Sequence, residues 1–228
     1  MIKYIKNIIC SPLKTSKYQV TKLGSNGCSW NVVLDELDSD SVIISGGVGQ
    51  DVSFELAISK ITGANVYLFD PSPTGIETID SLSDKLTAGK LKFEKKALSN
   101  KDGIFYLSPP DIKGEGSWRM STSSQEDDST IVQSIRLSSF CAEKLIQKID
   151  LLKIDIEGAE YEVLDDILSN QINVKQICVE FHCNAQIKID RTYFDIVIYL
   201  LKLWRCGYRI AYLTKSDFTL VKIYQEED

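Results

Sequence analysis

The chain has 228 residues, of which 43% are hydrophobic, and this is enough to bury one sizeable core in a single α/β domain. Its formal net charge is −6 and its basic residues are scattered, which argues against a nucleic-acid-binding surface. No run approaches the roughly 18 apolar residues of a membrane span, and lysines interrupt the apolar N-terminal residues too early for a secretory signal. The six cysteines include no C-x-x-C pair, so we expect reduced thiols. These features predict a cytoplasmic protein.

Residues 1–40 give a weak pattern and predict an N-terminal cap or extension. Within it, residues 18–37 favour a strand, a glycine-containing turn and a short helix. Such a segment either covers one end of a sheet or folds over a ligand.

From residue 41 onward, short β-rich runs alternate with longer amphipathic runs, which implies a mostly parallel sheet with helices on both faces. The last two strands are joined by a short turn and predict an antiparallel hairpin at one edge. Residues 41–228 therefore predict one Rossmann-like domain, with a Pro-, Gly- and Ser-rich loop insertion at 108–130. The predicted strands are 41–45, 65–70, 91–98, 131–137, 150–156, 174–183, 208–213 and 218–224. The predicted helices are 51–61, 75–86, 138–146, 159–169 and 191–207.

The ends of the first two strands carry residues that suit a nucleoside. Gly46, Gly47 and Gly49 follow the first strand, where absent side chains let backbone N–H groups approach a ligand. Asp70 closes the second strand, where a carboxylate accepts the hydroxyls of a ribose. Either feature alone also fits a plain tight turn or a helix-capping Asp. Together they predict a nucleoside-containing ligand.

The dinucleotide fingerprint G-x-G-x-x-G separates the candidate cofactors. Reading from Gly47 gives G-V-G-Q-D-V, so Val52 stands where the third glycine would allow close packing beneath a pyrophosphate. This disfavours NAD and FAD. An adenosine cofactor without a pyrophosphate fits better, and S-adenosylmethionine is the leading candidate.

Four segments carry a family resemblance: "SGGVGQDVSFELAI", "VYLFDPSP", "LKFEKKALSNKDG" and above all "LLKIDIEGAEYEVL" followed by "VEFH". In this order, over roughly residues 41–183, the chain resembles the FkbM family of S-adenosylmethionine-dependent methyltransferases. The resemblance implies a class I Rossmann-like methyltransferase with a seven-stranded, mostly parallel sheet and an antiparallel last strand. It also implies methylation of hydroxyl groups on small molecules or sugars.

The resemblance also implies which residues bind the cofactor. Gly47 and Gly49 match the family's glycine loop, and Asp70, with Pro71 beside it, matches the ribose-binding acid. Ala97 falls where the family's chain passes the adenine.

One position departs from the pattern of many class I methyltransferases. They carry an acid two residues before the first motif glycine, where this chain has Ser45. Recognition of the cofactor's amino group is then expected to fall to Asp51 or to a backbone carbonyl.

The stretch at the end of the strand 150–156 supplies the candidate catalytic groups. Methyl transfer to oxygen needs positioning and removal of the hydroxyl proton. His182, the only histidine, ends a neighbouring strand and is the candidate base as a neutral imidazole, unless it only hydrogen-bonds a loop. Asp155 and Glu157 share one strand face, as Glu180 and His182 do, so all four are expected to converge, with Asp155 also near the cofactor.

Two roles remain open for these converging groups. They either orient a polyhydroxyl substrate, which is favoured, or bind a divalent cation with oxygen and imidazole ligands. We assign no metal ligand. A purely structural alternative is that Asp155 caps the following helix, while the negative charge of Glu157 stabilises the N-terminus of that helix by interacting with its dipole.

Four further residues are candidates for substrate binding. Glu160 lies in the first turn of the helix at 159–169, and Trp30, Trp118 and Arg119 lie in predicted loops that would cover a substrate. The sequence therefore predicts an S-adenosylmethionine-dependent O-methyltransferase for a sugar or small metabolite, with a surface-glycan precursor as one candidate acceptor. The alternatives are a non-catalytic nucleoside-binding or partner module and an NAD-dependent oxidoreductase.

Overall fold

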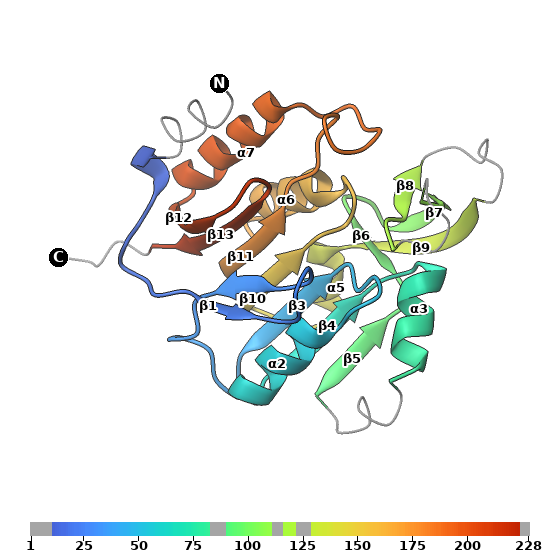
Figure 1. Cartoon of the computed structure of the whole chain (residues 1–228), viewed down its shortest axis with the longest axis horizontal. Coiled ribbons are helices and arrows are strands. Elements are labelled where there is room, and N and C mark those ends of the chain that lie inside the picture. The colour runs from blue at the N-terminus through green and yellow to red at the C-terminus, as the bar shows by residue number, and fades with distance from the viewer. Residues whose placement is uncertain (1–10, 83–89, 111–115, 122–128, 224–228) are drawn as a thin grey trace.

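The computed structural model describes residues 11–82, 90–110, 116–121 and 129–223, and the α/β class expected from the sequence is confirmed. A seven-stranded sheet forms the centre of the molecule, in the order β12-β13-β11-β10-β3-β4-β5 (Figure 1). Strands β11, β10, β3, β4 and β5 run parallel, while β13 is antiparallel to both of its neighbours. The strands are β3 (Val42–Gly46), β4 (Asn65–Phe69), β5 (Leu91–Glu94), β10 (Ile149–Ile154), β11 (Val174–Glu180), β12 (Tyr208–Leu213) and β13 (Asp217–Lys222).

Helices cover both faces of this sheet because its central strands are apolar on both sides. On β10, Leu151 packs into one buried cluster while Leu152 and Ile154 pack into the other. The first cluster takes side chains from α2 (Ser53–Thr62) and α3 (Pro73–Asp80). The second takes side chains from α5 (Leu137–Lys144), α6 (Glu160–Ser169) and α7 (Tyr193–Arg205).

A second sheet interrupts the predicted order. Its strand order is β6-β9-β7-β8, and its strands are β6 (Ala97–Ser99), β7 (Gly103–Ser108), β8 (Arg119–Ser121) and β9 (Thr130–Arg136). The single strand predicted at 91–98 is therefore wrong. After β5 the chain leaves the main sheet, and β6 pairs in parallel with β9. Strands β7 and β8 were not predicted, and part of the insertion at 108–130 lies outside the described residues.

The N-terminal segment adds a two-stranded hairpin of β1 (Thr21–Leu23) and β2 (Trp30–Val32). The Gln176 side chain on β11 bonds both the N–H and the C=O of Val33, at 2.8 and 3.0 Å. Thr219 on β13 donates to the carbonyl of Asn31. These bonds hold the chain extended, so the short helix predicted within 18–37 does not form. Among the described residues, no helix has the length and apolar character needed to cross a membrane.

Candidate active site

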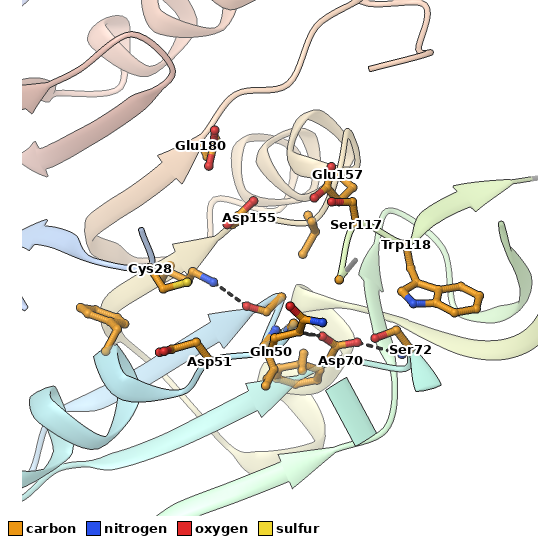
Figure 2. Close-up of a pocket in the computed structure, with 18 of the residues that line it drawn as sticks. Cys28, Gln50, Asp51, Asp70, Ser72, Ser117, Trp118, Asp155, Glu157 and Glu180 are labelled. Carbon is orange, nitrogen blue, oxygen red and sulfur yellow. Dashed lines mark hydrogen bonds between the residues drawn. The ribbon is translucent and has the colours of Figure 1, made fainter. Parts of the chain in front are cut away.

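A pocket of about 300 Å³ lies beyond the carboxyl ends of β3, β4, β10 and β11, where a parallel sheet binds its ligands. Figure 2 shows Asp51 and Asp70 on one side of this pocket and Asp155, Glu157 and Glu180 on the other. Of the predicted site residues, the pocket is lined by Trp30, Gly47, Gly49, Asp51, Asp70, Pro71, Ala97, Trp118, Asp155, Glu157 and Glu180. The predicted residues outside the lining are Gly46, Arg119, Glu160 and His182.

The turn after β3 is built around glycine. Gly47 has φ +84°, its N–H donates to the carbonyl of Phe69, and an added Cβ would collide with the carbonyl oxygen of Asp155. Gly49 also has a positive φ of +56°, but an added Cβ there meets nothing within 4 Å. Lys153 donates to the carbonyls of Gly46 and Gly47 from beneath the turn. The turn therefore needs glycine at position 47 for space as well as for backbone conformation.

Asp70 holds this turn against the end of β4. Its Oδ2 accepts the N–H groups of Val48 and Gly49, each at 2.9 Å, and its Oδ1 accepts the N–H of Ser72 at 2.8 Å. A carboxylate offers about four acceptor positions. Asp70 thus organises the loop first, and only its remaining acceptor capacity is left for a ribose.

Glu55 is a pocket residue that sequence reasoning missed. It lies in the first turn of α2 with 1% exposure, and its Oε1 accepts a 2.5 Å hydrogen bond from Ser45. Its Oε2 is buried without a hydrogen-bond partner in the described structure. Burial raises the pKa of Glu55, against the opposing charge of Lys153 and the bond from Ser45. The sequence did hold one indication of this residue, because Ser45 stands where an acid was expected and another segment must therefore supply the carboxylate.

Asp51, the sequence-based candidate for the cofactor's amino group, is already engaged. Its Oδ1 accepts the N–H of Ser53 at 2.7 Å, and its Oδ2 accepts the hydroxyl of Ser25 at 2.8 Å. Of the two acids, Glu55 has the unsatisfied oxygen beside the glycine turn.

Carboxylates surround the imidazole of His182 at the other end of the pocket. Nδ1 lies 2.9 Å from Oε1 of Glu160, while Nε2 lies 3.5 Å from Oε2 of Glu157 and 3.9 Å from Oδ1 of Asp155. Glu157 has φ +53°, an uncommon conformation for a residue other than glycine. Of the four groups expected to converge, Asp155 and Glu157 lie beside His182, whereas the third neighbouring carboxylate is Glu160 and not Glu180.

The surroundings of His182 differ from those of a neutral base. Burial lowers its pKa, but the hydrogen bond to Glu160 and the charges of Glu160, Glu157 and Asp155 outweigh burial and raise the pKa to about 10. Only 8% of its side chain is exposed, against 32% for Asp155 and 20% for Glu157. The surrounding carboxylates thus favour the protonated form of His182, and the expected neutral imidazole is disfavoured in this environment.

Two other sequence-based candidates lie away from the pocket. Glu160 has 0% exposure, and its carboxylate accepts the N–H groups of Ile156 and Gly158 as well as the bond to His182, so it organises the turn after β10. Its predicted substrate contact is therefore wrong for this geometry. Arg119 begins β8 and does not line the pocket.

The remaining candidates form the walls. The indole N–H of Trp118 donates to the hydroxyl of Thr74 at 3.0 Å. The ammonium of Lys153 lies over the ring of Trp30, 5.4 Å from the ring centroid. Glu180 accepts a hydrogen bond from Ser216, and burial together with the charge of Asp155 raises its pKa to about 7. These side chains come from distant segments and close the pocket from different sides.

A family model described as "Methyltransferase FkbM domain" matches residues 40–210, which is more than half of the chain. The chain belongs to the FkbM methyltransferase-domain family. This confirms the resemblance inferred from the sequence. Among curated proteins, it is 26% identical over 157 residues to the hexuronic acid methyltransferase AglP of Haloferax volcanii, covering 69% of this chain and 62% of that protein. The chain thus spans less than two thirds of this relative's length.

Solved structures of methyltransferases are also similar to this FkbM-family chain. One is an FkbM methyltransferase from Methylobacillus flagellatus, with 12% identity and a TM-score of 0.48 over 82% of this chain and 44% of that one. Another is an rRNA methylase from Streptococcus thermophilus, with 12% identity and a TM-score of 0.48 over 82% of this chain and 90% of that one.

Proposed function

We propose that this chain is an S-adenosylmethionine-dependent O-methyltransferase that acts on a hydroxyl group of a sugar. The observation that carries the proposal is one pocket with a glycine turn and the unsatisfied Glu55 at one end and a carboxylate cluster at the other. Family membership supports methyl transfer, and the relative named as a hexuronic acid methyltransferase supports a sugar acceptor.

The residues at the glycine turn fit the cofactor. The buried Oε2 of Glu55 needs a hydrogen-bond donor, and the ammonium group of the cofactor's methionine portion is a cationic one. Gly47 leaves room for close backbone approach, and Asp70 retains acceptor capacity for a ribose hydroxyl. Apolar side chains suited to an adenine ring line the adjoining wall: Phe69, Ala97, Leu98, Leu107 and Met120. When bound, S-adenosylmethionine supplies an electrophilic methyl group on a sulfonium.

In this proposal the acceptor binds at the carboxylate end of the pocket. Asp155 and Glu157 line the pocket while His182 lies behind them, so an entering hydroxyl meets a carboxylate first. Carboxylates accept hydrogen bonds from sugar hydroxyls and orient them, and the displacement depends mainly on such positioning. In this proposal Asp155 and Glu157 orient the reacting hydroxyl, one of the two carboxylates receives its single proton, and His182 positions both.

Transfer of a labelled methyl group tests the proposal. The purified chain is incubated with methyl-¹³C S-adenosylmethionine and a panel of hexose and hexuronic acid glycosides, and O-methyl signals are read by NMR. We expect an O-methyl product from at least one glycoside, and its loss in D155N. E162Q is the matched control, because Glu162 pairs with Arg191 outside the pocket. An O-methyl product of undiminished yield from D155N would contradict the role of Asp155. A methylated amine or thiol product would contradict the reaction.

A further inference from the structure

The cluster at the carboxylate end has the composition and spacing of a metal site. Oxygen atoms of Asp155 and Glu157 and a ring nitrogen of His182 all lie within 4.8 Å of one another. They come from the turn after β10 and the end of β11, which are held in register by the parallel sheet. We propose that these three side chains bind one divalent cation of the Mn²⁺ type.

The distances suit this assignment. Metal–ligand bonds of about 2.1 Å separate neighbouring ligand atoms by roughly 3 to 3.6 Å. Nε2 of His182 lies 3.5 Å from Glu157 and 3.9 Å from Asp155, and all three ligand atoms lie within 4.8 Å of one another, so the two carboxylate side chains must move closer together to complete the site. These separations are long for hydrogen bonds, and none is formed by Nε2 within the described part of the chain.

The buried His182 distinguishes this cluster from an ordinary group of surface carboxylates. Its side chain is more than nine-tenths buried, and its Nε2 is aimed at the two carboxylates. Glu160 engages Nδ1 at 2.9 Å and so favours a proton on Nδ1, while a cation that binds at Nε2 displaces the proton there and takes up the lone pair that faces the cluster. A histidine that binds a metal through one ring nitrogen usually donates the N–H of its other ring nitrogen to a carboxylate, a carbonyl or a water. Tyr161 donates to the His182 carbonyl at 2.7 Å and fixes the backbone as well.

The ligand set also selects the class of cation. Two carboxylates and an imidazole suit Mn²⁺ or Fe²⁺, whereas Ca²⁺ and Mg²⁺ prefer oxygen ligands alone. Three protein ligands leave coordination positions open, and the exposed parts of Asp155 and Glu157 face the pocket. If the proposed function holds, an acceptor hydroxyl occupies an open position and is polarised by the cation. Cation binding itself does not depend on that function.

Titration of the untagged chain with Mn²⁺ tests the site directly, with free Mn²⁺ followed by electron paramagnetic resonance. No cofactor or acceptor is present, so the result is separate from that of the methyl-transfer assay. We expect one saturable Mn²⁺ per chain and at least about a tenfold weaker affinity in D155N, E157Q and H182Q. E162Q is the control, since it removes the same charge from α6 at a residue outside the cluster.

Thermal unfolding in the presence and absence of Mn²⁺ distinguishes a folded variant that has lost the site from a variant that does not fold. The cation is expected to raise the midpoint of the wild type and of E162Q, and to leave that of folded E157Q unchanged. Two results would overturn the proposal: no saturable Mn²⁺ binding by the wild type up to about 1 mM, or equal affinity in the wild type and all three cluster variants. In either case the cluster is an imidazolium held by carboxylates and no cation site.

Discussion

Glu55 on α2 supplies a carboxylate beside the strand position where this chain has Ser45 in place of an acid. The strand residue at the usual acidic position is Ser45, and its hydroxyl bonds Oε1 of Glu55 from the facing helix. This bond orients the second oxygen, which has no partner among the described residues. An unpaired buried carboxylate oxygen is costly, so a cationic ligand group there gains more than it would on the surface.

Replacement of Glu55 is expected to weaken binding of the cofactor. In E55Q the cofactor's ammonium group loses a charge-assisted hydrogen bond of about 1.5 to 3 kcal/mol, so the Kd for S-adenosylmethionine rises roughly 10- to 100-fold. Calorimetric titration measures this, with E77Q as a control on an exposed acid of α3. Equal affinities in E55Q and E77Q would remove Glu55 from the cofactor site.

Acidification gives a second prediction for the same residue. The carboxylate is charged above its pKa, and burial raises the pKa of Glu55 above the ordinary value of about 4.3. Affinity for S-adenosylmethionine should therefore fall on acidification at a higher pH than an exposed glutamate would give. In E55Q this dependence should be absent. The same pH profile in both proteins would assign the effect to another group.

The sequence could place Asp155, Glu157 and His182 near one another because adjacent parallel strands end at one edge of the sheet. Strand alternation did not set their directions, since all three follow the ends of β10 and β11 and Glu157 has a φ of +53°. Glu55 was beyond this reasoning, because its bond to Ser45 depends on how a helix packs on the sheet. Glu160 was misplaced for a related reason, since its carboxylate turns back to two N–H groups of its own turn and to His182, which follows β11.

At the element scale, the turn between β3 and α2 depends on two glycines in different ways. Gly47 combines a positive φ with a collision against Asp155, while Gly49 has a positive φ and open space. We expect G49A to cost about 1 to 2 kcal/mol of unfolding free energy from backbone strain alone. G47A should cost more than about 4 kcal/mol, because the backbone at Asp155, directly after β10, must also move. Urea unfolding measures both, and equal losses would contradict the role of close packing at Gly47.

Strands and helices of the main sheet followed from hydrophobic periodicity, but the second sheet did not. Strands β6 and β8 have three residues each, too few to show alternation, and they are defined by pairing with β9 and β7. The segment at 91–98 was predicted as one strand because apolar residues alternate at its start and return at Ala97 and Leu98 after two lysines. The segment is divided between two sheets because β5 pairs with β4 and β6 pairs with β9, which are both distant in sequence.

At the scale of the whole molecule, the N-terminal hairpin is a wall of the pocket. Cys28 and Trp30 line the pocket, and Gln176 holds the following Val33 by two buried hydrogen bonds. Q176A leaves both backbone groups of Val33 unpaired, so we expect a loss of about 2 to 4 kcal/mol and faster hydrogen exchange at residues 28–33. The control is K22A on the exposed face of β1. Exchange as slow as in K22A would contradict this anchoring.

Calorimetric titration with S-adenosylmethionine, S-adenosylhomocysteine and NAD tests whether the pocket is an S-adenosylmethionine site. We predict one saturable site per chain for the first two ligands, weakened in E55Q, and no saturable binding of NAD. The buried Val52 at the third fingerprint position supports the last expectation. A folded chain that binds neither S-adenosylmethionine nor S-adenosylhomocysteine, or that binds NAD more tightly, would contradict the account.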